Sequence, residues 1–266
     1  MKIWYQTMTT YRYDPVWDEY GKGLEEQCKR AARPDTEVHV TGVPLFGKDL
    51  DKYKYIMYYH KNQCVNNMLK AEKEGYDVFV LGCSEDPALT EGRGLISIPV
   101  VGISQANMYV AGMMGELFTI VTSPRNLAEM YRQLVRLYGL ESKYLRGNYA
   151  LDVPEEEVAK SLKDPLPLAK EFKEVAKRAV ADGASVIIPI PAFIYNLFYR
   201  TEKLTNLDGA TVLDPVAVAV KVGEMFADLK KLGMEASRMY QVYSYPGKEI
   251  RDEILKKYAP TFKIEL

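Results

Sequence analysis

The chain has 266 residues and a formal net charge of −1, with 47% hydrophobic and 27% charged residues. These values are ordinary for a globular protein and give room for two small domains. They argue against a nucleic-acid-binding surface, and no apolar run is long enough to span a bilayer. Three irregularly spaced cysteines, two histidines and a polar N-terminus argue against a disulfide framework, a histidine zinc site and a signal peptide, and they predict a cytoplasmic location.

The first part of the chain alternates strand-like and helix-like segments. Strands are predicted where short apolar runs end in turn residues, and helices where apolar residues recur every three or four positions. In chain order the predictions are a strand at 2–6, a helix from about 15 to 33, a strand at 37–41, a helix at about 50–74, strands at 77–81 and 98–103, and a helix at 106–114. His60 and Cys64 fall on one apolar stripe and are interpreted as packing residues.

The second part continues the alternation. The predictions are a strand at 117–122, a helix from Ser123 to about 138, a short strand at 144–146, a helix start at 154–156, a helix at 166–182, strands at 186–190 and 210–213, and helices at 215–232 and from about 248. This order predicts an α/β fold with parallel sheets. We expect a first lobe at 1–115, a second lobe at 116–219, and a C-terminal segment, 220–266, that packs back on the first lobe.

Two stretches of the sequence share one layout. EGYDVFVLGCSEDP followed by IPVVGISQANMYVAG matches DGASVIIPIPAF followed by GATVLDPVAVAVKVG. Each has an acidic residue and a glycine, a buried strand, a turn, a helical linker, a short strand and an Ala/Val-rich helix. The repeat aligns Gly75 with Gly183 and Cys83 with Pro191. A unit used twice predicts two pseudo-symmetric lobes, each a short parallel sheet flanked by helices, with a small-molecule site between them.

Cys83 follows Gly82, the first residue after the predicted strand 77–81. Open α/β sheets bind ligands at the carboxyl ends of their strands, so this cysteine stands where a site is expected. Turn amides and the Ser84 hydroxyl would lower the thiol pKa, whereas Glu85 and Asp86 would raise it. The position alone leaves two interpretations, a reactive thiol and a buried packing residue.

GCSEDPAL followed by IPVVGISQANMYVA resembles the first catalytic segment of the aspartate/glutamate racemase superfamily, and most closely its hydantoin racemase-like branch. KIWYQTMT, FTIVTSP, DGASVIIPIPAF and LDPVAVAVKVGEMFADLKKLG extend the similarity, in order, over nearly the whole chain. The resemblance implies two α/β lobes and a cofactor-independent enzyme. It also implies one thiol from each lobe, on opposite faces of a carbon acid, so that one removes a proton and the other delivers one.

The chain departs from that pattern in its second lobe. Cys83 matches the first thiol, but Pro191 stands where the second is expected. Three chemistries remain open: an isomerase or racemase whose second proton carrier is a tyrosine, a carboxylate or water; an arylmalonate-type decarboxylase; and a cysteine-nucleophile isomerase or hydrolase. A ligand-binding relative without activity is the non-enzyme alternative. The apolar stretch 190–193 favours a cyclic or aromatic amide or carboxylate as substrate.

The resemblance also implies that strand ends and neighbouring turns bind the substrate. The predicted substrate-binding residues are Gln6, Thr7, Thr9, Ser84, Asp86, Thr122, Ser123, Pro191, Ala192, Arg238 and Tyr240. The alternative role of Ser123 is to cap the helix that follows it. Asp214 is interpreted as the start of a helix. Arg238 is interpreted either as a ligand of a substrate carboxylate or as a structural residue. We expect a homo-oligomer that acts on a small molecule, with no nucleic acid, membrane, metal or cofactor.

Overall fold

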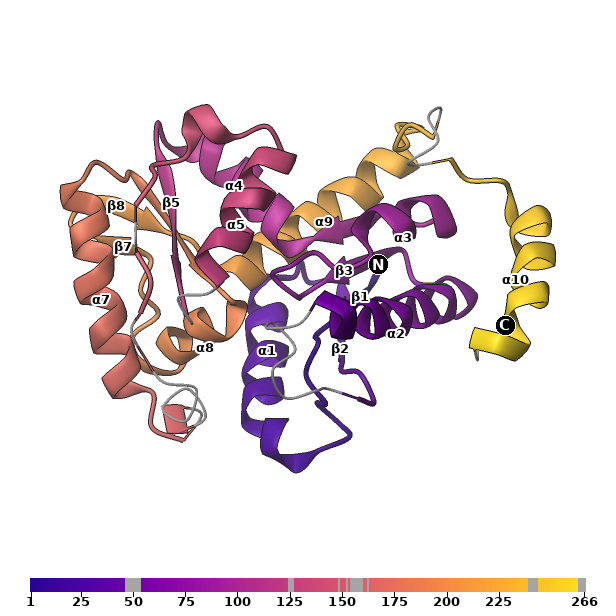
Figure 1. Ribbon diagram of the computed structural model, residues 1–266, viewed down its shortest axis with the longest axis horizontal. Helices are drawn as coiled ribbons and strands as arrows, with labels where there is room; N and C mark the ends of the chain where they lie inside the picture. Colours follow the sequence, from indigo (N-terminus) through magenta and orange to yellow (C-terminus); the bar gives the residue numbers. More distant parts are fainter. Residues whose placement is uncertain are drawn as a thin grey trace.

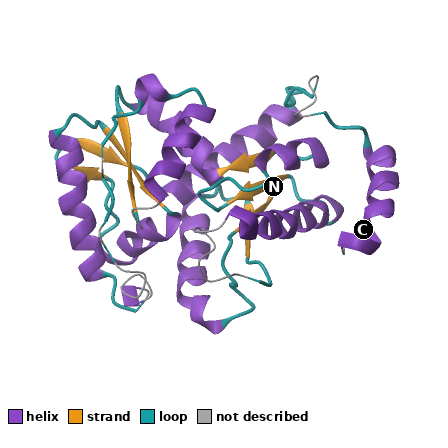
Figure 2. Ribbon diagram, in the orientation of Figure 1, coloured by secondary structure: helices purple, strands orange, loops and turns teal. Residues whose placement is uncertain are grey.

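The computed structural model describes residues 1–45, 54–123, 127–147, 149–151, 153, 160–161, 163–238 and 244–262. These residues form two four-stranded sheets with helices packed around them, which confirms the predicted α/β class (Figures 1 and 2). In this part of the chain every helix is too short or too polar to serve as a membrane span.

The first sheet is parallel throughout and has the strand order β2-β1-β3-β4. Its strands are β1 (Lys2–Gln6), β2 (Glu37–Thr41), β3 (Val78–Leu81) and β4 (Val100–Gly102). The predicted bounds of β1 and β2 are confirmed, whereas β4 is shorter than the predicted strand at 98–103. It ends at Gly102 because that residue is already the N-cap of the next helix.

The helices of this lobe are a 3-10 turn η1 (Pro15–Trp17), α1 (Asp18–Ala31), α2 (Lys54–Lys73), α3 (Leu89–Leu95) and α4 (Ile103–Met114). The helix predicted from about 15 to 33 is therefore two elements. His60 and Cys64 on α2 are 2% and 0% exposed, which confirms their interpretation as packing residues.

The second sheet has the order β5-β6-β8-β7. Its strands are β5 (Phe118–Thr122), β6 (Val186–Ile190), β7 (Asn206–Leu207) and β8 (Ala210–Val212), and only β7 runs antiparallel to its neighbour. Single parallel bridges pair Phe118 with Tyr144 and Thr122 with Ala150 on the free side of β5. The strand predicted at 144–146 is thus reduced to one bridge, in the place that β2 has in the first lobe.

The helices of the second half are α5 (Leu127–Leu137), a 3-10 turn η2 (Glu141–Lys143), α7 (Leu166–Ala181), α8 (Ala192–Thr201), α9 (Pro215–Lys231) and α10 (Lys248–Phe262). The helix start predicted at 154–156 lies outside the described residues. The segment predicted as a helical linker after β6 is α8, a helix of 10 residues whose inner side is buried.

The repeated layout of the sequence is present in the fold. β3-α3-β4-α4 has the same order as β6-α8-β8-α9, apart from the short strand β7 that the second copy adds before β8. Gly75 and Gly183 end the preceding helices with φ of +74° and +110°, a conformation that glycine adopts without strain. The last helix of each repeat also reaches the other lobe, since α4 packs against β5 and β6 while α9 packs against β3 and β4. Figure 1 shows α9 between the two sheets, so the lobes share their helices.

Candidate active site

The end of β1 lies beside the end of β3, which brings two predicted segments together. The Gly82 amide donates to the Gln6 carbonyl at 2.7 Å, and this places Cys83 next to Thr7. The Thr7 hydroxyl lies 3.3 Å from that of Thr9, so both threonines belong to this edge of the sheet.

Gln6 itself is held in structural hydrogen bonds. Its side-chain nitrogen donates to the carbonyls of Thr7, Thr41 and Gly42 at 2.8 to 3.0 Å. Its side-chain oxygen accepts from the Trp4 indole at 3.0 Å and the Asn67 amide at 2.7 Å. The amide group has no capacity left for a substrate. Gln6, predicted as substrate-binding, organises the strand-end loops instead.

Cys83 is half-buried against an apolar cluster that contains Met8 and Cys64. Burial raises its pKa well above that of an ordinary thiol, and the charges of Glu85 and Asp86 raise it further, while a hydrogen bond from the Glu85 amide opposes them. The sequence left the direction of this shift open, and desolvation decides it. The resting side chain is therefore a neutral thiol at pH 7.

Three tyrosine phenols lie within electrostatic reach of the Cys83 sulfur, those of Tyr5, Tyr20 and Tyr131. The Tyr5 ring lies over Gly82, where a Cβ would come within 2.3 Å of it, so that position requires glycine. The Tyr5 hydroxyl is buried and has no hydrogen-bond partner among the described residues. The sequence left open a tyrosine as one possible second proton carrier, but it did not identify these three phenols.

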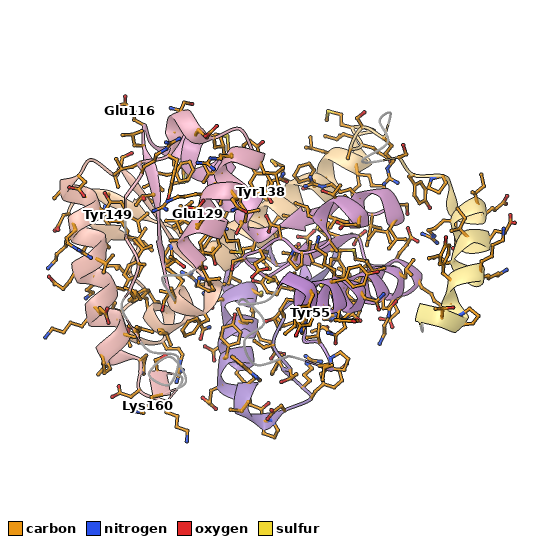
Figure 3. The ribbon with its side chains drawn as sticks, viewed as in Figure 1. Tyr55, Glu116, Glu129, Tyr138, Tyr149 and Lys160 are labelled. Carbon is orange, nitrogen blue, oxygen red and sulfur yellow. The ribbon has the colours of Figure 1, made fainter. Side chains whose placement is uncertain are left out.

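The residues after Cys83 connect the two lobes. The Ser84 hydroxyl lies 2.7 Å from that of Tyr131 on α5. Asp86 accepts from the amides of Ser104 and Gln105 at 3.0 and 2.8 Å and from the Tyr138 hydroxyl at 2.6 Å. Tyr138, labelled in Figure 3, lies near the centre of the molecule. Asp86, predicted as substrate-binding, thus caps α4 and joins it to α5.

The environment of Asp86 explains its electrostatics. Burial raises its pKa to about 6, although the bonds from Tyr138, Gln105 and Ser104 act in the opposite direction. A Cβ at Gly102 would lie 2.5 Å from this carboxyl group. The carboxyl is thus enclosed between the end of β4 and the start of α4.

On the second lobe, Thr122 and Ile190 pair at the carboxyl ends of β5 and β6. Thr122 and Ser123 are 2% and 1% exposed. Neither hydroxyl has a hydrogen-bond partner in the described part of the chain. The residues that Ser123 would cap, 124–126, lie outside it. The Thr122 side chain lies near the Tyr131 phenol and acts to lower its pKa. Both side chains are polar groups at the strand edge with bonding capacity left over.

Pro191 follows β6 as the N-cap residue of α8. The next residue, Ala192, is 3% exposed and belongs to the same apolar cluster as Tyr5 and Tyr20 of the first lobe. The Pro191 turn therefore meets the first lobe at the tyrosines that surround Cys83. It supplies no proton-carrying side chain there.

Asp214 is the N-cap of α9 and accepts from the Val216 and Ala217 amides, as its interpretation as a helix start predicted. It also accepts from Gln27 at 3.3 Å and from Arg30 of α1. The buried carboxylate therefore fastens α1 of the first lobe to the start of α9, which is a structural role.

Arg238 lies away from this edge. Its guanidinium donates to the Ile96 carbonyl at 3.0 Å, and Ile96 precedes β4. Because β3 and β4 are parallel, Ile96 lies at the amino ends of the strands and Cys83 lies at their carboxyl ends. The structure therefore does not bring Arg238 to Cys83. Tyr240 lies outside the described residues. Among the described residues, no three His, Cys, Asp or Glu side chains are grouped so that they could hold a metal ion.

Comparison with known proteins gives one consistent family. The family model described as Asp/Glu/hydantoin racemase matches residues 18–223. A hydantoin racemase of Pseudomonas sp. (strain NS671) is 30% identical over 229 residues, covering 86% of this chain and 87% of the relative. A hydantoin racemase of Rhizobium meliloti is 32% identical over 178 residues, 66% of this chain and 69% of the relative.

A solved structure shows the same fold. Allantoin racemase from Klebsiella pneumoniae superposes with a TM-score of 0.72 at 24% identity, over 93% of this chain and 94% of that one. This likeness confirms the two-lobed α/β architecture that the repeated sequence layout predicted.

Proposed function

The chain belongs to the Asp/Glu/hydantoin racemase family and is an isomerase of the racemase type, and from this premise we propose that it acts on the acidic C–H bond of a hydantoin-like cyclic amide, with Cys83 as its single reacting thiol. The observation that carries the proposal is the position of this thiol. It is half-buried just after β3, among phenols and hydroxyls from both lobes, with the Pro191 turn in the place of a second thiol.

The substrate class follows from the relatives and from the chemistry of the site. Two curated relatives are named hydantoin racemases. A hydantoin carries its C–H bond between a ring carbonyl and a ring nitrogen, so the carbanion formed there is stabilised as an enolate. The apolar side of the site, with Ala192 and Phe193, suits a flat ring with an apolar substituent better than a small charged amino acid.

One thiol is sufficient to remove a proton from the substrate and to return one. Cys83 first loses its own proton to solvent, which only a small fraction of the thiol does at neutral pH because its pKa is raised. The thiolate then takes the proton from the ring carbon, and the electron pair of the C–H bond moves into the ring while the carbonyl oxygen becomes an enolate. The hydroxyls of Thr122 and Ser123 are the proposed donors to a polar substrate atom, because both are without partners in the described part of the chain. The Cys83 thiol then returns a proton to the carbon. These steps need no cofactor.

Inversion needs a proton on the opposite face, and Pro191 has none to give. Water or one of the neighbouring phenols must supply it. Once the Cys83 thiol has exchanged its new proton with D₂O, it can return a deuteron to the same face without a second carrier, so we expect exchange of the substrate proton to be faster than inversion. This separates the proposal from symmetric two-thiol racemisation, in which the two rates are comparable.

The test is hydrogen exchange with enantiopure 5-benzylhydantoin in D₂O near neutral pH. Loss of the C5–H signal in the proton NMR spectrum measures exchange, and chiral chromatography measures inversion, each corrected for the uncatalysed rate. We expect Cys83→Ala to lower the exchange rate by about 10²- to 10⁴-fold. Cys64→Ala is the matched control, since Cys64 is a buried thiol of the cluster against which Cys83 packs.

Other outcomes identify other chemistries. A covalent adduct on Cys83 seen by mass spectrometry would indicate a nucleophilic isomerase or hydrolase, and release of CO₂ from an arylmalonate would indicate a decarboxylase. Equal activity of the Cys83→Ala variant and the unmodified chain would refute the role of Cys83.

A further inference from the structure

An apolar cavity lies beside the edge strand β4, away from the site around Cys83. It has a volume of about 500 Å³ and is lined by β4, α4, α9 and the residues that follow α9. Its walls are mainly apolar, and the side chains that form them include Val101, Val110, Met113, Val222, Met225 and Phe226. Met113 and Met225 are 79% and 49% exposed at its rim. This volume is within the range of small-molecule sites, and the unbranched methionines suit an adaptable apolar ligand.

The charges of this groove are all of one sign. Among the described residues that line it, Arg93 and Arg238 are the charged ones, and none of them is a carboxylate. Arg93 donates to the Val100 carbonyl at 3.2 Å and to the Gln105 side chain at 2.7 Å, both neutral acceptors. Its charge acts on Asp86 through space, without an ion pair. The groove therefore combines apolar walls with two positively charged side chains.

Arg238, like Arg93, has no carboxylate partner among the described residues. It donates to the Ile96 carbonyl and lies over the Tyr245 ring, 4.5 Å from the ring centre. Its Nε and Nη1 have no hydrogen-bond partner in the described part of the chain. Arg251, over the same ring, is neutralised by Glu72 and Asp252 at 2.5 and 2.8 Å. Since a guanidinium favours a carboxylate partner over neutral ones, Arg238 has unused capacity for an anion.

We propose that this groove binds a small amphipathic carboxylate, with its apolar chain or ring along α4 and α9 and its carboxylate on Arg238. Ile96 and Ile98 precede β4, so the part of the groove beside Arg238 is at the amino ends of the strands, opposite to Cys83. The site is thus distinct from the proposed racemase site, and it does not depend on the identity of the racemase substrate.

The test is isothermal titration calorimetry of the full chain with decanoate, kept below its micelle concentration. We expect binding with Kd below about 1 mM, as for a ligand of this size in an apolar groove. Decanol has the same chain without the charge, and we expect it to bind at least about tenfold more weakly. Arg238→Gln should weaken decanoate to the same extent, whereas Arg132→Gln, a surface arginine of α5, should leave the affinity unchanged.

A second variant tests the apolar part. Val110→Trp fills the groove from α4, and we expect it to abolish decanoate binding without changing the exchange activity. Decanol binding as tightly as decanoate, or unchanged affinity in Arg238→Gln, would contradict the carboxylate site. If decanoate fails to bind, and Val110→Trp instead changes the sedimentation of the protein from oligomer to monomer, the groove is an interface between copies and the proposal is wrong.

Discussion

At the scale of single residues, the site is governed by desolvation around Cys83. The other two thiols are more deeply enclosed, since Cys28 and Cys64 are 1% and 0% exposed. Burial raises the pKa of both, that of Cys64 to about 12. The three thiols therefore differ mainly in access, because all are neutral near pH 7.

The first prediction concerns the pH dependence of Cys83. A raised thiol pKa means a smaller thiolate fraction at neutral pH, and the fraction grows as the pH rises. We expect alkylation by iodoacetamide to be slow at pH 7 and to accelerate above pH 9, with Cys83 modified before Cys28 and Cys64. Peptide mass mapping at timed intervals measures this order. Fast, pH-independent labelling of Cys83 would show that its thiolate is stabilised, contrary to the environment described here.

The second prediction concerns the partnerless Tyr5 hydroxyl. Tyr5→Phe removes a buried polar group that makes no hydrogen bond, so we expect the free energy of unfolding to stay unchanged or to rise by about 1 kcal/mol. Tyr11→Phe is the matched control, because its hydroxyl donates to Glu25 at 2.8 Å. Thermal unfolding should give Tyr5→Phe a higher Tm than Tyr11→Phe. The reverse order would mean that Tyr5 has a partner, such as an ordered water.

At the scale of elements, the ends of helices join the lobes. Asp86 connects the start of α4 to α5, and Asp214 connects α1 to the start of α9. The Asn196 side chain on α8 donates to Gln27 on α1 at 2.7 Å, and a Cβ at Gly23 would clash with Asn196 at 2.5 Å. Close approach of α1 and α8 thus requires glycine on α1. These contacts keep the turns after β3 and β6 near each other.

The third prediction follows from the Asp86 pKa of about 6, raised by burial from 3.8. A carboxyl whose folded pKa is raised contributes stability that is fully present below pH 3.8 and is lost as the pH rises through 6. Asp86→Asn cannot ionise, so this loss should be absent from it. The difference in unfolding free energy between the variant and the unmodified chain should shift by about 2–3 kcal/mol between pH 4 and pH 7, measured by urea denaturation. A difference that is constant with pH would show that Asp86 titrates normally.

At the scale of the whole molecule, helices of each lobe pack against the sheet of the other lobe. α4 and α9 pack against each other and each reaches both sheets, so neither sheet is covered by its own lobe alone. Ala192, Val216 and Val220, which follow the second lobe's strands in the chain, lie in the apolar cluster of the first sheet. In Figure 1 the chain returns through α9 to the first lobe, and α10 lies beyond α2 at its far side.

The fourth prediction is that the lobes unfold together. Both tryptophans, Trp4 and Trp17, belong to the first lobe, so their fluorescence reports on it, while far-UV circular dichroism reports on the whole chain. Because α9 covers the first sheet from the second half of the sequence, we expect the two urea transitions to coincide. A fluorescence midpoint clearly separated from the circular dichroism midpoint would show that the lobes are independent.

The local sequence pattern was enough to predict many of the strands and helices, and the position of Cys83 after a strand. Strands such as β1, β2 and β6 were predicted with their observed bounds, because short apolar runs closed by turn residues are complete signals within a few neighbouring residues. The repeat also predicted two lobes, since each copy contains its own strand, turn and helix. That Cys83 lies in the turn after a strand follows from the same pattern.

Only the tertiary structure decided what surrounds that thiol. Tyr131 is 47 residues from its partner Ser84, and Tyr138 is 52 residues from Asp86. Such pairs form where two helices or strands pack, and neither side chain carries a sign of its partner in the local sequence. The same reason explains Gln6, whose polar side chain at a strand end resembles a ligand until its own hydrogen bonds are seen, and Arg238, which the returning C-terminal chain carries to the far edge of the sheet. Local chemistry fixes which groups stand at the strand ends, and long-range packing decides which of them remain available to a substrate.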